Sequence, residues 1–287
     1  MTLSSKKKCH PQAATRPKDP TCFTWMTLRF APVDWRVLVG VLALLAACGT
    51  KDAPSPLQPS DDFGRVRFVN MITDPIRNPV TAILENLPFG VGLAYTAATP
   101  QSLAAPSTAP YDPVYVGNRT VVVKRTADTS VTLATITFPI AKDEDKTVYA
   151  TGGTAGAAVT NLVTTDVNTV PLATEVRLRI VNMSPSAGPV DVFVTAPGAD
   201  LTGATPDAAG LASGAASAYF TRAPATYVVR FVPAGTPAAA RNTSVTLTVS
   251  NTSTTNTAFT GGTARSIVAA DAAAGGTPLR GFILIDR

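Results

Sequence analysis

Cysteine and histidine, the side chains that most often carry nucleophilic or metal chemistry, are confined to the early part of this 287-residue chain. The only histidine is His10, and the three cysteines are Cys9, Cys22 and Cys48. After Cys48 the sequence therefore excludes a Ser-His-Asp or Cys-His arrangement, a disulfide framework and a cysteine–histidine zinc site. A cysteine thiolate is itself a good nucleophile for alkylation. Cys48 is therefore the first candidate for chemistry.

A short apolar run leads up to Cys48. Val37–Ala47 is eleven residues long, carries no charge, and follows the basic residues Arg29 and Arg36. A membrane-spanning helix needs about 20 apolar residues, so this run matches the central region of a signal peptide instead. We interpret residues 26–47 as the signal peptide. Residues 1–25 are polar and contain prolines, and we interpret them as a misassigned extension before a true start at Met26.

The residues at the end of the apolar run are Leu45, Ala46, Ala47 and Cys48. They resemble the lipobox of bacterial lipoproteins, a large apolar residue and two small ones before the cysteine. The resemblance implies that Cys48 receives a diacylglycerol and that cleavage falls just before it. Two or more acyl chains hold a protein firmly at a membrane. Residues 48–63, rich in Pro, Ser and Asp, are then expected to form a flexible tether.

Charge divides the chain at the same cysteine. Of the 24 Lys and Arg and the 19 Asp and Glu, seven basic and two acidic residues precede Cys48, which leaves 17 of each sign after it. The overall charge of +5 therefore belongs to the leader. A nucleic-acid binder would keep a positive excess in its folded part, so we expect no nucleic-acid partner.

A repeat with a period of about 110 residues follows the tether and predicts two tandem domains, at residues 64–172 and 173–287. Each copy contains four segments that match in order. The matched pairs are Arg67–Met71 with Arg179–Met183, Pro79–Leu84 with Pro189–Val194, Thr129–Leu133 with Thr243–Leu247, and Thr147–Gly153 with Thr257–Gly262.

Apolar and polar residues alternate within the copies, as in Val176–Ile180 and Val245–Val249. This period of two, with frequent Thr and Val and regular Pro and Gly turns, is typical of half-buried strands. We expect an all-β fold made of two tandem immunoglobulin-like β-sandwiches.

The segments 176–185 (VRLRIVNMSP) and 188–194 (GPVDVFV) resemble the bacterial domain of unknown function 4397. The closing segment Gly281–Asp286 is similar to the last strand of that family. The first copy departs from the pattern at residues 72–75 and 80–82. The resemblance implies β-sandwiches in secreted or lipid-anchored envelope proteins, and it implies no known activity.

Several polar residues after the tether are candidates for chemistry, and in each case we expect a structural role. The cluster Asp143–Asp145 is predicted to be a solvated turn rather than a glycosidase pair or a calcium site. Asn70 and Asn182 are expected to organise the turns that follow them, and Asp191 to make a cross-strand or loop-capping contact. Arg177 and Arg179 are expected on a solvated sheet face, with contact to anionic glycans as the functional alternative. None of Lys51, Lys124, Lys142 and Lys146 lies in a Ser-x-x-Lys context.

Together these features predict a non-enzymatic cell-envelope protein with a binding or structural role, anchored to the membrane at Cys48. We expect no catalytic residue, no cofactor and no metal, and an envelope protein or glycan as partner. Gly49 replaces the aspartate associated with inner-membrane retention, which favours the outer membrane. The alternatives are a carboxylate-dependent hydrolase of envelope glycans and an assembly factor for an exported complex.

Overall fold

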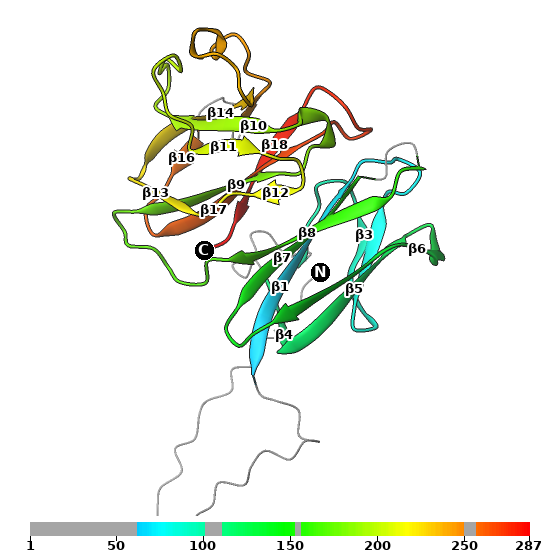
Figure 1. The fold of residues 1–287 in the computed structure, drawn as a ribbon. Coiled ribbons are helices and arrows are strands. Elements are labelled where there is room, and N and C mark those ends of the chain that lie inside the picture. The colour runs from blue at the N-terminus through cyan, green and yellow to red at the C-terminus, as the bar shows by residue number, and fades with distance from the viewer. Residues whose placement is uncertain (1–61, 101–110, 153–155, 250–256) are drawn as a thin grey trace, which may run out of the picture. The chain divides into compact units, whose positions relative to one another are not determined.

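The computed structural model describes residues 62–100, 111–152, 156–249 and 257–287. Strands dominate these residues, and no helix among them could span a membrane. The all-β class and the sandwich-like arrangement of the sheets are confirmed (Figure 1). Cys48, the lipobox residues Leu45, Ala46 and Ala47, the predicted signal peptide and the predicted tether up to residue 61 lie outside the described residues.

The first copy contains two four-stranded sheets. One sheet has the order β4-β1-β7-β8, formed by Asp112–Tyr115, Phe63–Ile72, Asp145–Gly152 and Val159–Asp166. The other has the order β3-β2-β5-β6, formed by Leu87–Leu93, Val80–Leu84, Gly117–Arg125 and Asp128–Ile140. Strands β1 and β7 run parallel, and the other pairs are antiparallel.

The second copy repeats this topology. One sheet joins β9 (Val176–Asn182) to β17 (Thr263–Ala270) and β18 (Arg280–Ile285), with β12 (Ala215–Ala216) and β13 (Phe220–Arg222) on the other edge of β9. The other joins β10 (Val190–Thr195) to β11 (Ala208–Leu211) and β14 (Ala225–Pro233), and β14 pairs with β15 (Leu247–Val249) and β16 (Thr257–Phe259). Short 3-10 turns occupy Pro185–Ala187 and Ala238–Ala240. The immunoglobulin-like assignment remains a prediction.

One of the four sequence matches between the copies is wrong. The segment Thr147–Gly152 lies on β7, whose structural counterpart is β17, because each runs parallel to the first strand of its copy. The segment Thr257–Phe259 is β16, which pairs with β14 as β6 pairs with β5. Short strings of Thr, aromatic and Gly residues recur easily in β-proteins, and only the pairing separates the two alignments.

Strands β1 and β9 are buried on both faces. Their inward residues, such as Phe68 and Ile180, belong to the apolar core of their own copy. Their outward residues Val69, Met71, Val181 and Met183 form a third apolar cluster that contains residues of both copies. The two copies therefore pack against each other through their equivalent sheets.

Candidate functional site

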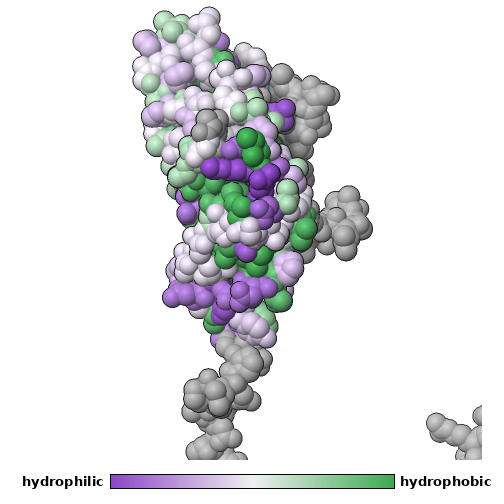
Figure 2. All heavy atoms as spheres, turned by 90° about the vertical axis from the view of Figure 1, so that its right-hand side faces the viewer, coloured by the Kyte–Doolittle hydropathy of each residue, from purple (hydrophilic) through white to green (hydrophobic). Residues whose placement is uncertain are grey.

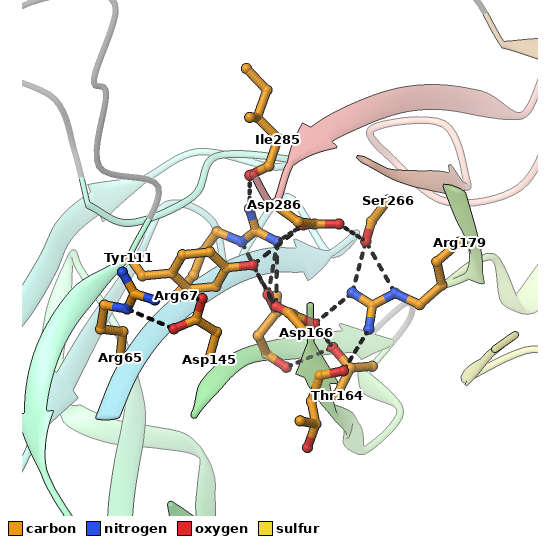
Figure 3. A network of polar contacts seen from close by, with 12 residues as sticks. Arg65, Arg67, Tyr111, Asp145, Thr164, Asp166, Arg179, Ser266, Ile285 and Asp286 are labelled. Carbon is orange, nitrogen blue, oxygen red and sulfur yellow. Dashed lines mark hydrogen bonds and ion pairs between the residues drawn. The ribbon is translucent and has the colours of Figure 1, made fainter. Parts of the chain in front are cut away.

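Two buried arginines occupy equivalent places in the two copies and bind across the contact between them (Figure 3). Arg67 on β1 and Arg179 on β9 are 3% and 2% exposed. Arg67 Nη2 donates to Asp286 Oδ1 at 2.7 Å, and Arg179 Nη2 donates to Asp166 Oδ1 at 2.6 Å. Each carboxylate follows or ends the last strand of its own copy and pairs with the arginine of the other copy.

Register explains why a hydroxyl accompanies each arginine. Arg67 lies opposite Thr147 on β7, and Arg179 lies opposite Ser266 on β17. Arg67 donates to Thr147 Oγ1 at 2.8 Å, and Arg179 donates to Ser266 Oγ at 2.7 Å. Each hydroxyl then donates to the carboxylate of its own copy, Thr147 to Asp166 and Ser266 to Asp286.

A tyrosine covers each arginine. The guanidinium carbon of Arg67 lies 4.6 Å from the ring centre of Tyr111, and that of Arg179 lies 4.6 Å from Tyr219. The Tyr111 hydroxyl donates to Asp166 Oδ2 at 2.7 Å, and the Tyr219 hydroxyl donates to Asp286 Oδ2 at 2.8 Å. We call these eight residues the crossed network: Arg67, Tyr111, Thr147, Asp166, Arg179, Tyr219, Ser266 and Asp286.

Electrostatics keep the crossed network in one charge state. Burial alone would lower the pKa of Arg67 and Arg179, but the surrounding tyrosines and carboxylates raise the pKa of each above its usual value. Burial raises the pKa of Tyr111 and Tyr219 well above the ordinary value. The arginines are therefore cationic and the phenols are neutral donors. Such an arrangement is suited to holding two sheets together, and it leaves no group ready to exchange a proton near neutral pH.

Arg179 corrects the sequence analysis. Its outward direction on β9 was expected to place it on a solvated face, but the first copy covers that face and Arg179 is buried. Arg177, two residues earlier on the same face, is partly exposed. Asp166 and Asp286 were not predicted. Their recurrence just after an apolar or Thr-rich closing strand was the available signal, since each is the aspartate at the end of its copy.

The acidic cluster Asp143–Asp145 is only partly the solvated turn that was predicted. Asp143 is exposed, whereas the Asp145 side chain is fully buried and begins β7. Its carboxylate pairs with Arg65 at 2.7 Å and with Arg287. Burial raises the pKa of Asp145 to about 6, against the opposing effect of Arg65. Within the described ranges no group of three or more His, Cys, Asp and Glu side chains could hold a metal ion.

The matched asparagines have the turn-organising contacts that were expected. Asn70 accepts from the Ile72 amide and donates to the carbonyls of Leu93 and Ala94. Asn182 accepts from the Ser184 amide at 3.2 Å and donates to the Gly188 carbonyl at 2.9 Å.

Asp191 has the loop-capping role that was predicted for it. One carboxylate oxygen accepts from the Gly210 amide at 2.8 Å and the other from the Gly235 amide at 3.4 Å. It therefore joins two loops of the second copy, and its lack of an acidic counterpart in the first copy follows from a local role.

Residues 64–193 match the family named domain of unknown function 4397, DUF4397. The chain resembles the DUF4397 family. The matched region begins in β1 and ends in β10, so it covers the first copy and the opening strands of the second. The repeated topology extends the DUF4397-like pattern through β18. No curated protein matches the chain.

Proposed function

We propose that this DUF4397-like chain is a lipid-anchored cell-envelope protein with a non-enzymatic binding or structural role, and that its two copies act as one rigid unit. The crossed network is the observation that carries the second half of the proposal. Its two cations and two carboxylates satisfy one another at the contact between the copies. A site that has all its charges paired and buried favours a structural role over turnover.

The anchoring half of the proposal rests on the lipobox Leu45-Ala46-Ala47-Cys48 and the apolar run before it. Acylation at Cys48 would hold the unit at a membrane, and Gly49 favours the outer membrane. An envelope protein or glycan is the proposed partner.

A carboxylate-dependent hydrolase is the second candidate, and one observation favours it, namely the raised pKa of Asp145. A glycosidase pair needs a second carboxyl group and room for substrate between the two. The Asp145 carboxylate is instead enclosed by Arg65 and Arg287, so the non-enzymatic role is the better supported.

Labelling of growing cells with an alkyne analogue of palmitate tests the anchor. We expect the full chain to carry label and the Cys48→Ser variant to carry none. Equal labelling of both would refute acylation at this residue. The labelled lipoprotein is then assayed in detergent on envelope glycans and peptides, beside the Asp145→Asn variant. Turnover that Asp145→Asn abolishes would replace the proposed role with the hydrolase.

A further inference from the structure

An apolar groove lies at the end of the first copy where the described chain begins. It has a volume of about 460 Å³, and its apolar lining residues are Leu84, Leu87, Pro88, Phe89, Val114 and Tyr115. Leu87 is 70% and Tyr115 46% exposed, which is unusual for large apolar and aromatic side chains in a packed domain. Figure 2 shows hydrophobic residues among hydrophilic ones at the lower end of the molecule, where β1 begins in Figure 1.

Local backbone geometry builds this groove. Glu85 and Asn86 both have positive φ, 48° and 68°, and form the tight turn between β2 and β3 that presents Leu87. Tyr115, at the end of β4, pairs with Phe63 at the start of β1, and their ring centres are 4.7 Å apart. Phe63 is itself 41% exposed, so it extends the apolar surface to the point where the chain arrives from Cys48.

Chain length limits how far this surface can lie from the anchor. Fourteen peptide steps separate Cys48 from Asp62, and a chain of that length reaches at most about 50 Å even when fully extended. Tethering within such a distance raises the effective concentration of a bilayer at this end of the first copy far above that of any freely diffusing partner.

We propose that this groove and the adjoining Phe63 dock on the surface of the phospholipid bilayer that holds Cys48. The inference rests on the proposed lipid anchor. Aromatic and aliphatic side chains at the tip of a fold partition into the boundary between headgroups and acyl chains. The polar residues of the groove are Glu85, Asp112 and Arg119, and the Arg119 guanidinium already donates to the carbonyls of Tyr115 and Val116. We therefore expect docking that depends little on anionic lipid or on salt.

A tryptophan reporter tests this docking, because both native tryptophans, Trp25 and Trp35, precede Cys48. Leu87→Trp places the only tryptophan of the processed chain in the groove. Ile76→Trp is the matched control, since Ile76 is 71% exposed and follows the opposite end of β1, about 33 Å away for a ten-residue strand. Each acylated variant is incorporated into vesicles that contain brominated phosphatidylcholine, which quenches tryptophan within the bilayer. We expect quenching several-fold stronger at position 87 than at 76, nearly unchanged by added salt.

Equal, weak quenching at both positions would overturn the docking proposal, as would a signal at position 87 that responds to protein concentration rather than to brominated lipid. The latter result would assign the groove to a second copy of the chain. Failure of the anchor is read separately, from the mass of the processed N-terminus and from flotation with vesicles. If acylation fails, Cys48, the only cysteine of the processed chain, can be coupled to a maleimide lipid. The same comparison of positions 87 and 76 then decides the docking.

Discussion

Each buried arginine is neutralised by a carboxylate of the other copy. Arg67 contacts Asp286 at 2.7 Å and lies 3.7 Å from Asp166, so the carboxylates of both copies converge on it. Removing one member of a buried ion pair leaves the other charge without compensation, which costs far more than the pair contributes as a whole. The crossed network therefore makes the fold of one copy sensitive to single substitutions in the other.

Arg179→Met should strongly destabilise the protein, because Asp166 would lose its buried cation while the methionine still fills the space. We expect the free energy of unfolding to fall by about 3 to 5 kcal/mol, measured by urea denaturation. Arg177→Met is the matched control on the same face of the same strand, partly exposed, and should change stability by less than about 1 kcal/mol. Equal effects of the two substitutions would contradict the importance of the network.

Asp145 should make stability depend on pH. Its pKa in the folded protein is about 6, above the value of about 3.9 for an unfolded aspartate. The folded state therefore binds the proton more tightly, so the contribution of this group is fully present below pH 4 and is lost as pH rises through 6. The loss amounts to at most about 3 kcal/mol.

Asp145→Asn should remove this fall in stability between pH 4 and 6, seen as a difference between the urea-unfolding curves of variant and native protein at several pH values. Asp143→Asn is the control, because Asp143 is exposed and its positive φ of 58° is a conformation that asparagine tolerates. Parallel pH profiles for the native protein and Asp145→Asn would contradict the raised pKa.

At the scale of elements, the connection between the copies is fixed to the second copy by a turn. The amide of Gly262, between β16 and β17, donates to the carbonyls of Leu172 and Glu175. A Cβ added at the adjacent Gly261 would lie only 1.8 Å from the Ala173 carbonyl oxygen. The close approach of these two backbone segments therefore requires glycine at position 261.

Gly261→Ala should force the connection away from this turn and lower the free energy of unfolding by about 1 to 3 kcal/mol. Gly203→Ala is the control, since a Cβ there meets nothing within 4 Å. It should leave stability unchanged or raise it by up to about 1 kcal/mol. Chemical denaturation of both variants checks this, and a neutral Gly261→Ala would show that the connection is free to move.

At the scale of the whole molecule, the described copies share a buried apolar contact next to the crossed network. Met71 and Met183 are each 1% exposed within it, and Thr151 Oγ1 lies 3.2 Å from the carbonyl oxygens of both. Apolar packing and ion pairing together should make the two copies unfold as one cooperative unit.

The double variant Met71→Ala/Met183→Ala should weaken that coupling, at a cost of about 2 to 5 kcal/mol for each buried side chain. Differential scanning calorimetry should show one transition for the native protein and two for the variant. Ile76→Ala, at an exposed position, should keep the single transition. A single transition in the double variant, with equal calorimetric and van't Hoff enthalpies, would contradict the coupling.

Much of the fold could be predicted from alternation and repetition. The period of two in Val176–Ile180 predicted a strand, and the recurrence of Arg67–Met71 as Arg179–Met183 identified equivalent first strands. The roles of Asn182 and Asp191 followed from local backbone bonding, which short sequence separations already constrain. The match of Thr147–Gly153 to Thr257–Gly262 failed because a short string does not specify which strand it pairs with.

The sequence by itself determined that charge, histidine, tryptophan and spare cysteine end at Cys48, and that the rest is a duplicated, strand-forming chain. These properties depend only on residue types and their spacing. The tertiary structure alone decided that Arg179 is buried and that Asp166 and Asp286 exchange arginines between the copies. Alternation shows which side chains share a face of a strand, but whether that face meets water or another sheet depends on packing between segments more than 100 residues apart.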